Sequence, residues 1–103
     1  MNRGGVYEAE AGARRGPVVV VTRDQAIPVL ANVTVAGVTT RVRGLATEVP
    51  LDERHGLDRE SVINCDNLFT IPKSAVGRLR GRLDPESAAR LREALMLALG
   101  LND

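Results

Sequence analysis

Residues 14–22, "RRGPVVVVT", decide how the rest of the chain is interpreted. Four consecutive valines favour an extended backbone, and an unbroken apolar run is typical of a strand buried on both of its faces. Proline is accepted at the first residue of a strand, so the sequence predicts a buried strand over residues 18–21, after Pro17. Arg14 and Arg15 are expected to stand just before this strand, which gives their guanidinium groups a rigid base.

The flanking sequence predicts further short strands separated by turns. Each candidate is rich in β-branched residues or alternates in polarity, and each is bounded by glycine, proline or charged residues. These segments cover residues 5–10, 29–40, 45–51, 61–66 continued by 68–71, and 76–83. In the last of them, Arg78, Arg80 and Arg82 are expected on one face, because strand side chains alternate.

The C-terminal sequence predicts a helix with well-marked ends. Asp84 is a favourable N-cap, Pro85 fits the first helical position, and Gly100 can end the helix. Apolar residues with helical spacing are expected to pack on a sheet, and they are Leu91, Ala94, Leu95, Ala98 and Leu99. Met96 and Leu97 fall outside this stripe, which favours a homodimer, because excess apolar surface often marks an interface.

Length and composition narrow the class of protein. The chain has 103 residues, 44% of them apolar, and is expected to form a single domain, residues 1–103. Its apolar runs are shorter than the ~20 residues of a membrane span and Cys65 is the single cysteine, so we expect a cytoplasmic protein without disulfides. A net charge of +1 argues against a protein that coats nucleic acid by bulk electrostatics. Any phosphate binding must therefore be local.

The order of these elements indicates a mainly β (α+β) fold. Short strands followed by one terminal helix predict a small, partly open barrel with the C-terminal helix packed across it. A five-stranded oligonucleotide-binding barrel has the same pattern and stays open as an alternative.

Residue counts exclude most familiar catalytic sites. A two-histidine ribonuclease needs a partner for His55, which lies in the charged segment 52–60 and is expected to be a solvated residue of an exposed loop. The carboxylates have no spacing that would gather a metal site, so no metal or other cofactor is expected. Cys65 lies in an apolar strand and is expected to be a structural thiol.

Arginine and hydroxyl groups remain as candidates for chemistry. Thr39 and Thr40 end the long strand that follows the valine strand, and Arg41 and Arg43 come next. If the two strand ends lie at one rim, these donors and Arg15 converge, and they could hold a phosphate and stabilise a pentacoordinate phosphorane. The alternative is that they only cap a solvated sheet edge.

Five segments, in order over about residues 3–101, resemble the MazF family of bacterial toxin endoribonucleases. "RGGVYEAE" is similar to the family's "RGDVY" opening, and "GPVVVVTRD" is similar to its "RPVLVVSND" strand. "AGVTTRVRGLATEVPL" resembles the segment with the family's threonine and a following "TEV" or "FEV". "RESVINCDNLFTIPKSAVG" resembles "RDSVALCDQIRTIDKSRLG", and "GRLDPESAARLREALMLALGL" resembles "GRLSPEEMAAVDEALRRVLGL".

This resemblance implies an SH3-like barrel, a homodimer and metal-independent, sequence-specific cleavage of single-stranded RNA. The implied reaction is attack by the ribose 2′-hydroxyl, which leaves 2′,3′-cyclic phosphate and 5′-hydroxyl ends. The resemblance also implies a cognate, MazE-like antitoxin that blocks the RNA groove.

The family's catalytic pair is an arginine directly before the strand's proline and a threonine at the end of the next long strand. Thr39 matches the threonine, but Gly16 stands at the place of the arginine. We expect Arg15 to substitute for it, because glycine's backbone freedom can swing the preceding side chain into the vacated site. Arg14 is the second candidate for this catalytic role. The residues expected to bind RNA are Arg14, Arg41, Arg43, Asn67 and Lys73.

Two other functions stay open. A non-catalytic toxin of the same fold could bind a protein target, as the gyrase poison CcdB does, although the aromatic C-terminal tail of that relative is replaced here by "GLND". A plain single-strand-binding barrel is disfavoured by the low net charge and by the presence of only one Tyr and one Phe.

Overall fold

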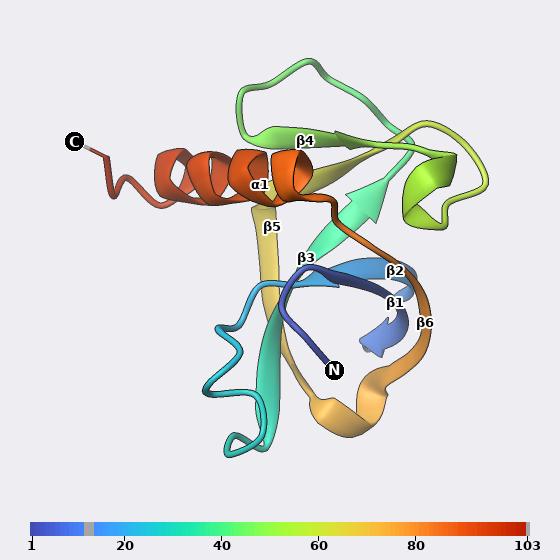
Figure 1. Cartoon of the computed structure of the whole chain (residues 1–103), viewed down its shortest axis with the longest axis vertical. Coiled ribbons are helices and arrows are strands. Elements are labelled where there is room, and N and C mark those ends of the chain that lie inside the picture. The colour runs from blue at the N-terminus through green and yellow to red at the C-terminus, as the bar shows by residue number, and fades with distance from the viewer. Residues whose placement is uncertain (12–13, 103) are drawn as a thin grey trace.

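The computed structural model describes residues 1–11 and 14–102 and contains one sheet and one α-helix (Figure 1). The strands are β1 (Gly5–Ala11), β2 (Arg14–Val20), β3 (Asn32–Thr39), β4 (Glu48–Leu51), β5 (Ser61–Pro72) and β6 (Val76–Arg82). They pair antiparallel in the spatial order β4-β5-β3-β2-β1-β6. The short 3-10 helices η1 (Glu53–His55) and η2 (Lys73–Ala75) and the helix α1 (Pro85–Ala98) complete these elements.

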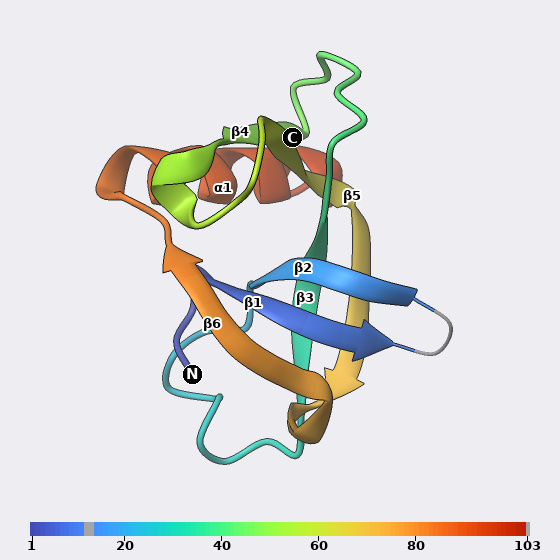
Figure 2. The ribbon, with the colours of Figure 1, turned by 90° about the vertical axis from the view of Figure 1, so that its right-hand side faces the viewer.

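The sheet curls without closing. β4 and β6 form its two edges, and within the described residues they do not pair with each other. α1 packs against β4 and β5 at one end of the molecule (Figure 2). The predicted partly open barrel with a C-terminal helix is therefore confirmed, with six strands rather than the five of the alternative. No helix in the described part of the chain has the length and apolar character needed to cross a membrane.

The valine run is buried on both faces, as predicted. Val19 joins a core that α1 and β4 cover, whereas Val18 and Val20 join a second core formed with β1, β3 and β5. All three side chains are at most 2% exposed. The alternation along β2 thus places the sheet between two cores, which is why an unbroken apolar strand is needed here.

β2 begins earlier than the valine run indicates. Arg14 and Arg15 belong to the strand itself, opposite Ala11 and Glu10 of β1. Figure 2 shows the hairpin of β1 and β2 projecting toward the side on which β5 runs. The valines marked only the buried half of β2, because the exposed half has no apolar signal.

Two other strands are shorter than predicted. β3 begins at Asn32, because the backbone N–H groups of Val29 and Leu30 both donate to the carbonyl of Ala26, at 3.1 and 3.0 Å, and turn the chain. β4 begins only at Glu48.

β5 is a single strand interrupted by a bulge. It pairs with β3 at Ala36–Leu68 and then at Gly37–Asn64, so residues 65–67 have no partner on β3. A bulge bends the strand and re-aims the side chains around it. It lies close to the end of β3.

The helix begins where the sequence predicts. Asp84 caps it by accepting a hydrogen bond from the backbone N–H of Ser87 at 3.3 Å. Leu91 and Ala94 are buried in the core, as expected of the apolar stripe, but Leu99 lies beyond the helix and is 56% exposed.

The arginines of β6 do not share one environment, contrary to the simple alternation expected. The pairing of β6 with β1 slips twice, on both sides of Tyr7. Arg80 is largely buried and donates to Glu8 at 2.6 Å, whereas Arg82 is exposed and Arg78 is exposed without a described ion pair.

Candidate functional site

A hollow of about 150 Å³ lies at the end of β3 and brings together four of the predicted site residues. We call it the Thr39 hollow, and its lining consists of Thr39, Arg41, Arg43, Asn64 and Asn67. Three segments build it, namely the end of β3, the chain that follows, and the bulge of β5. Its size is below the roughly 300–1,000 Å³ of pockets that enclose a drug-sized ligand, so it suits a single small group.

The segment carrying the two arginines is held by short-range hydrogen bonds. The Thr39 Oγ1 accepts from the backbone N–H of Arg41 at 3.1 Å. Glu48, a buried carboxylate, accepts from the backbone N–H groups of Arg43 at 3.0 Å and Leu45 at 3.2 Å. These bonds fix the backbone on both sides of the arginines, while both arginine side chains remain exposed.

Most free polar groups of the hollow are donors, and the Asn67 amide, which can also accept, is the exception among the lining residues. Oγ1 of Thr39 already accepts one hydrogen bond, and its O–H remains able to donate. Oδ1 of Asn64 accepts from the backbone N–H of Asp66 at 3.0 Å, which leaves the NH2 group of Asn64. Two guanidinium groups and no carboxylate line the described hollow. An electron-rich group such as a phosphate fits this set of donors.

Arg15 lies outside the Thr39 hollow. Its guanidinium forms an ion pair with Glu10, the residue directly opposite it on β1. Strand alternation puts Arg15 on the face of β2 that also carries Val19, whereas Thr39 belongs to the face of β3 that carries Val35. The expected convergence of Arg15 and Thr39 is therefore not present, and their catalytic roles stay predictions.

A second hollow, of about 440 Å³, contains Arg15 instead. Its lining includes Glu8, Glu10 and Ser74. The side chain of Arg14 lies outside the described residues.

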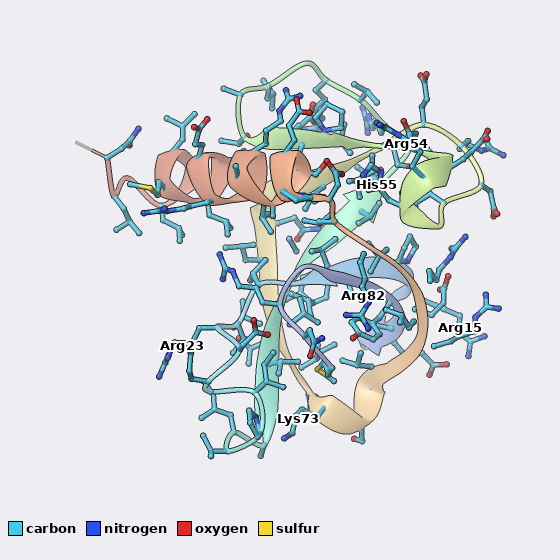
Figure 3. All side chains as sticks on the ribbon, viewed as in Figure 1. Arg15, Arg23, Arg54, His55, Lys73 and Arg82 are labelled. Carbon is cyan, nitrogen blue, oxygen red and sulfur yellow. The ribbon has the colours of Figure 1, made fainter. Side chains whose placement is uncertain are left out.

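Lys73 is also separate from the Thr39 hollow. Figure 3 shows it at the end of the molecule opposite α1. It lies beyond the far end of β3, where its backbone N–H donates to the carbonyl of Ala31 at 3.1 Å. β3 runs from Asn32 at that end to Thr39, which is about 23 Å for the seven steps between them at roughly 3.3 Å per residue. Its Nζ donates to the carbonyl of Ile27 at 2.8 Å. Lys73 instead lines a hollow of about 710 Å³ with Arg3 and other residues.

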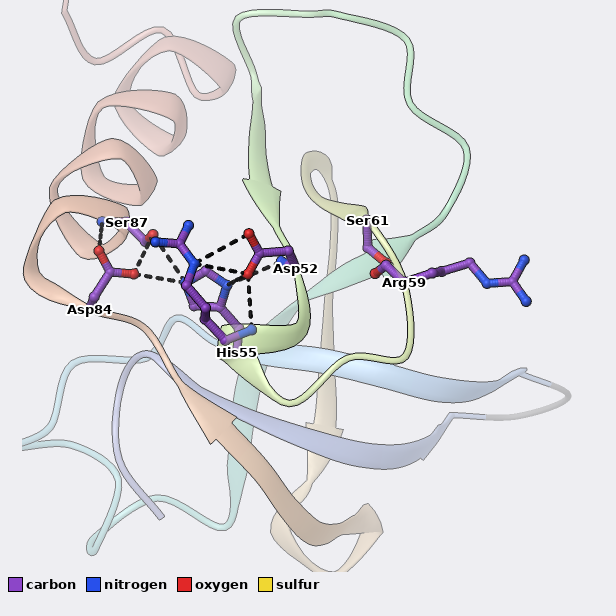
Figure 4. A network of polar contacts seen from close by, with 7 residues as sticks. Asp52, His55, Arg59, Ser61, Asp84 and Ser87 are labelled. Carbon is purple, nitrogen blue, oxygen red and sulfur yellow. Dashed lines mark hydrogen bonds and ion pairs between the residues drawn. The ribbon is translucent and has the colours of Figure 1, made fainter.

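His55 is buried, so the prediction of a solvated loop residue was wrong. Figure 4 shows its ring between Asp52 and Asp84. Its Nδ1 accepts from the backbone N–H of Asp52 at 3.1 Å, and its Nε2 lies 2.7 Å from Oδ1 of Asp84. A neutral ring with an accepting Nδ1 carries its proton on Nε2 and donates it to Asp84. Hydrogen bonds from Ser87 and His55 hold the pKa of Asp84 well below its usual range.

This cluster is structural rather than catalytic. The Oγ of Ser87 donates to the same carboxylate oxygen of Asp84 at 2.7 Å, so its proton is not directed at the imidazole. The contacts instead join η1 to the start of α1. Gly56, which follows η1 with a φ of +84°, is so close to β6 that a Cβ would lie 2.0 Å from the carbonyl oxygen of Arg80.

Cys65 is a buried thiol, as predicted. It is 1% exposed, and burial raises its pKa to about 11. A thiol with this pKa is protonated at neutral pH, which makes it a poor nucleophile.

Sequence reasoning missed Asn64 and Glu48 as parts of the site. Asn64 faces the hollow because of the β5 bulge, and no local pattern predicted that bulge. In the sequence Glu48 resembled any other strand residue. A carboxylate that closely follows a loop can accept hydrogen bonds from the backbone N–H groups of that loop, and this is the signal that could have identified Glu48.

Comparisons with known proteins agree with this architecture. Residues 2–99 match the family described as PemK-like, MazF-like toxin of type II toxin-antitoxin system. The chain is 49% identical over 86 residues to the endoribonuclease MazF3 of Mycobacterium tuberculosis, which covers 84% of each protein. Among solved structures it resembles the toxin MazF-mt6 of Mycobacterium tuberculosis, with 44% identity, a TM-score of 0.88 and coverage of 93% of this chain and 96% of that one.

A second structure extends the similarity over nearly all of the chain. It is an endoribonuclease from a mycobacterial species in complex with its cognate antitoxin, with 30% identity, a TM-score of 0.89 and coverage of 98% of this chain and 96% of that one. The family match, these identities and the shared fold together lead to one assignment. The chain belongs to the PemK-like, MazF-like family of type II toxin-antitoxin toxins.

Proposed function

We propose that this protein is the toxin of a type II toxin-antitoxin system and a metal-independent endoribonuclease that cleaves single-stranded RNA at short specific sequences. Its relative MazF3 is an endoribonuclease, and the chain covers 84% of that relative. The observation that carries the proposal is the Thr39 hollow, where a hydroxyl, two guanidinium groups and two amides surround a space suited to one phosphate or base. We place the enzyme in the cytoplasm.

The proposed reaction is an internal transphosphorylation. The ribose 2′-oxygen forms a bond to the adjacent phosphorus, and the bond from phosphorus to the 5′-oxygen of the next nucleotide breaks. The 2′-hydroxyl loses its proton and the departing 5′-oxygen gains one, so the products are a 2′,3′-cyclic phosphate and a 5′-hydroxyl. The hydroxyl of Thr39 would donate to a non-bridging oxygen, where charge develops in the transition state.

Arg15 is our candidate for the arginine that stabilises the phosphorane and assists proton transfer. To reach the Thr39 hollow its guanidinium must leave Glu10 and move from the face of the sheet that carries Val19 to the face that carries Val35. Both side chains are mostly exposed, at 77% and 64%, and an exposed ion pair contributes only about 0.2–1 kcal/mol. A doubly charged phosphorane can compete for the guanidinium at this cost. Arg14 is the second candidate.

The same proposal assigns the binding of RNA and of protein partners. Arg41, Arg43 and Asn67 would contact the RNA in the hollow, and Lys73 and Arg14 would contact it outside. A MazE-like antitoxin would cover the RNA-binding surface, because a mycobacterial endoribonuclease of the same fold is in complex with its cognate antitoxin.

A homodimer is proposed from the apolar surface at the end of α1. Leu97, Leu99 and Leu101 are 44%, 56% and 67% exposed there, and clustered apolar side chains favour association. Sedimentation of wild type and of Leu97→Glu tests this, since the charged variant should be monomeric.

The decisive test incubates the purified protein with a long RNA in EDTA and maps the ends of the fragments. We expect discrete fragments with 5′-hydroxyl ends. Arg15→Ala should lower the cleavage rate by about 10²- to 10³-fold, as the loss of one hydrogen-bond donor to the transition state does. Arg23→Ala, which removes another exposed arginine, is the matched control and should cleave like wild type.

Two results would contradict parts of this proposal. Undiminished cleavage by Arg15→Ala, with a large loss in Arg14→Ala, would transfer the catalytic role to Arg14. Intact RNA with wild-type protein, together with inhibition of DNA gyrase, would favour the non-catalytic toxin of the same fold.

A further inference from the structure

We propose that Asn64 selects the base beside the cleaved phosphate and favours a keto base, uracil or guanine, over an amino base, cytosine or adenine. This inference rests on the proposed endoribonuclease function. It concerns a residue that the sequence pattern did not single out.

The sheet places Asn64 next to Thr39 on the same face. In the pairing of β3 with β5, Thr39 lies opposite Val62. Asn64 follows Val62 by two residues and lies opposite Gly37, which precedes Thr39 by two residues. Diagonal neighbours of this kind lie roughly 7–8 Å apart, and their Cβ atoms are somewhat closer. Gly37 has no side chain, so β3 places nothing over Asn64, and the amide is free to face the hollow.

The bulge of β5 fixes which end of the amide is free. Oδ1 of Asn64 accepts from the backbone N–H of Asp66 at 3.0 Å, which closes a tight local turn. A backbone N–H can only donate, so the assignment of the amide oxygen follows from this contact. Among the described residues the NH2 group of Asn64 has no protein partner. The NH2 group is therefore the end of the Asn64 amide that is left wholly free for a ligand, while Oδ1 is engaged in the turn.

A donor of fixed direction distinguishes bases by their exocyclic groups. Uracil O4 and guanine O6 accept hydrogen bonds, whereas cytosine N4 and adenine N6 donate them. A free asparagine usually pairs with adenine by donating to N7 and accepting from N6, but Oδ1 of Asn64 is engaged with the Asp66 N–H, which disfavours this two-point pairing. An amino group at this place would leave two donors facing each other, which is unfavourable.

The other groups of the hollow reinforce this choice. The Thr39 hydroxyl can donate, and the guanidinium groups of Arg41 and Arg43 have no acceptor function. A ligand group that accepts hydrogen bonds is thus favoured beside Thr39, Arg41 and Arg43, whereas the Asn67 amide can serve either kind of group.

The test measures cleavage of four synthetic RNAs that differ only in the base beside the scissile phosphate. The cleavage map of the wild type fixes the rest of their sequence. We expect wild type to cleave the uracil or guanine substrate about 5- to 150-fold faster than the cytosine and adenine substrates, the range of one good contact to a base edge. Equal rates for all four RNAs would overturn the inference and leave the proposed function intact. No cleavage of any RNA would contradict both.

The variant Asn64→Asp reverses the polarity of the free group. Its carboxylate can still accept from Asp66, but it presents an acceptor to the base, so the ratio of rates should shift toward cytosine or adenine. The matched control is Asn32→Asp, which introduces the same charge at the exposed far end of β3 and should keep the wild-type ratio. Retention of the keto preference by Asn64→Asp would refute the role of Asn64.

A second variant covers the case in which Asn64→Asp does not fold. Asn64→Ala removes the amide donor, and water can replace the lost acceptor for the Asp66 N–H because Asp66 is exposed. Its thermal midpoint should stay near that of wild type and its four rates should become similar. A thermal midpoint near that of wild type together with an unchanged keto preference would also refute the inference.

Discussion

Replacement of Thr39 by valine tests the proposed chemistry with little change in shape. Valine is β-branched like threonine, so the backbone of β3 and the packing around the side chain should persist. The hydroxyl group is lost, and with it the acceptor at 3.1 Å for the backbone N–H of Arg41 and the donor that faces the hollow.

The structure allows the effects on stability and on rate to be separated. Thr39 is partly exposed, so water can take over from the lost acceptor, and the free energy of unfolding should fall by only about 0.5–1.5 kcal/mol. A donor aimed at the charge of the transition state is worth more, on the order of 10²- to 10³-fold in kcat. The loss of cleavage should therefore exceed any loss of folded protein.

The assay is single-turnover cleavage of a short RNA in EDTA at saturating enzyme, together with urea denaturation of each variant. Thr34→Val is the matched control, because Thr34 lies on the same strand and its Oγ1 also makes one hydrogen bond, to Thr70 at 2.9 Å. The control should lose similar stability and cleave at the wild-type rate. If Thr39→Val cleaves within a few-fold of Thr34→Val, the hydroxyl does not act in the transition state and the reasoning fails.

Four other changes test the fold and the site. Glu10→Gln should raise the cleavage rate by up to about fivefold in a kinetic assay, because the exposed pair that holds Arg15 is worth at most about 1 kcal/mol; a lower rate would contradict this restraint. Leu91→Ala should lower the unfolding free energy by about 2–5 kcal/mol in urea, since Leu91 is 2% exposed, and a loss below 1 kcal/mol would show that the core is mis-assigned. Gly56→Ala should lower the thermal midpoint strongly because of its φ of +84° and the close carbonyl, and a midpoint like that of wild type would refute the tight packing of η1 on β6. The pKa of Asp84 is lowered in the folded state, so its carboxylate stabilises the fold above the unfolded pKa of about 3.9, and this stabilisation is lost as the pH falls. Asp84→Asn should therefore have a lower thermal midpoint than wild type at pH 7, and its midpoint should decline less between about pH 5 and 2. Parallel plots of thermal midpoint against pH for the two proteins would contradict this assignment.

Local patterns predicted the elements of this fold well. The valine run marked β2, and Asp84, Pro85 and Gly100 marked the ends of the helical segment, because strand preference and helix capping depend on neighbours in the chain. Boundaries without such signals were less accurate. The early part of β2 depends on its pairing with β1, and the late start of β3 depends on the turn at residues 26–30, which no sequence signal had marked.

The environment of single residues was harder to predict. His55 was expected in solvent, but it is buried because Asp84, 29 residues later, returns to accept from it. Arg15 was expected to meet Thr39, but the strand register directs it to Glu10. Contacts of this kind depend on register and on a return of the chain, which no local pattern contains.

The sequence by itself determined the order of strands and helix, the burial of the valine strand and the resemblance to a toxin family. Each depends on residue types at fixed short spacing, which the chain carries before it folds. Only the tertiary structure decided which donors share a hollow, since the bulge in β5 turns Asn64 and Asn67 toward Thr39 and the pairing of β2 with β1 keeps Arg15 away. The reason is that a shift of the strand register by one residue moves each side chain to the opposite face of the sheet, and the packing of the whole molecule sets that register.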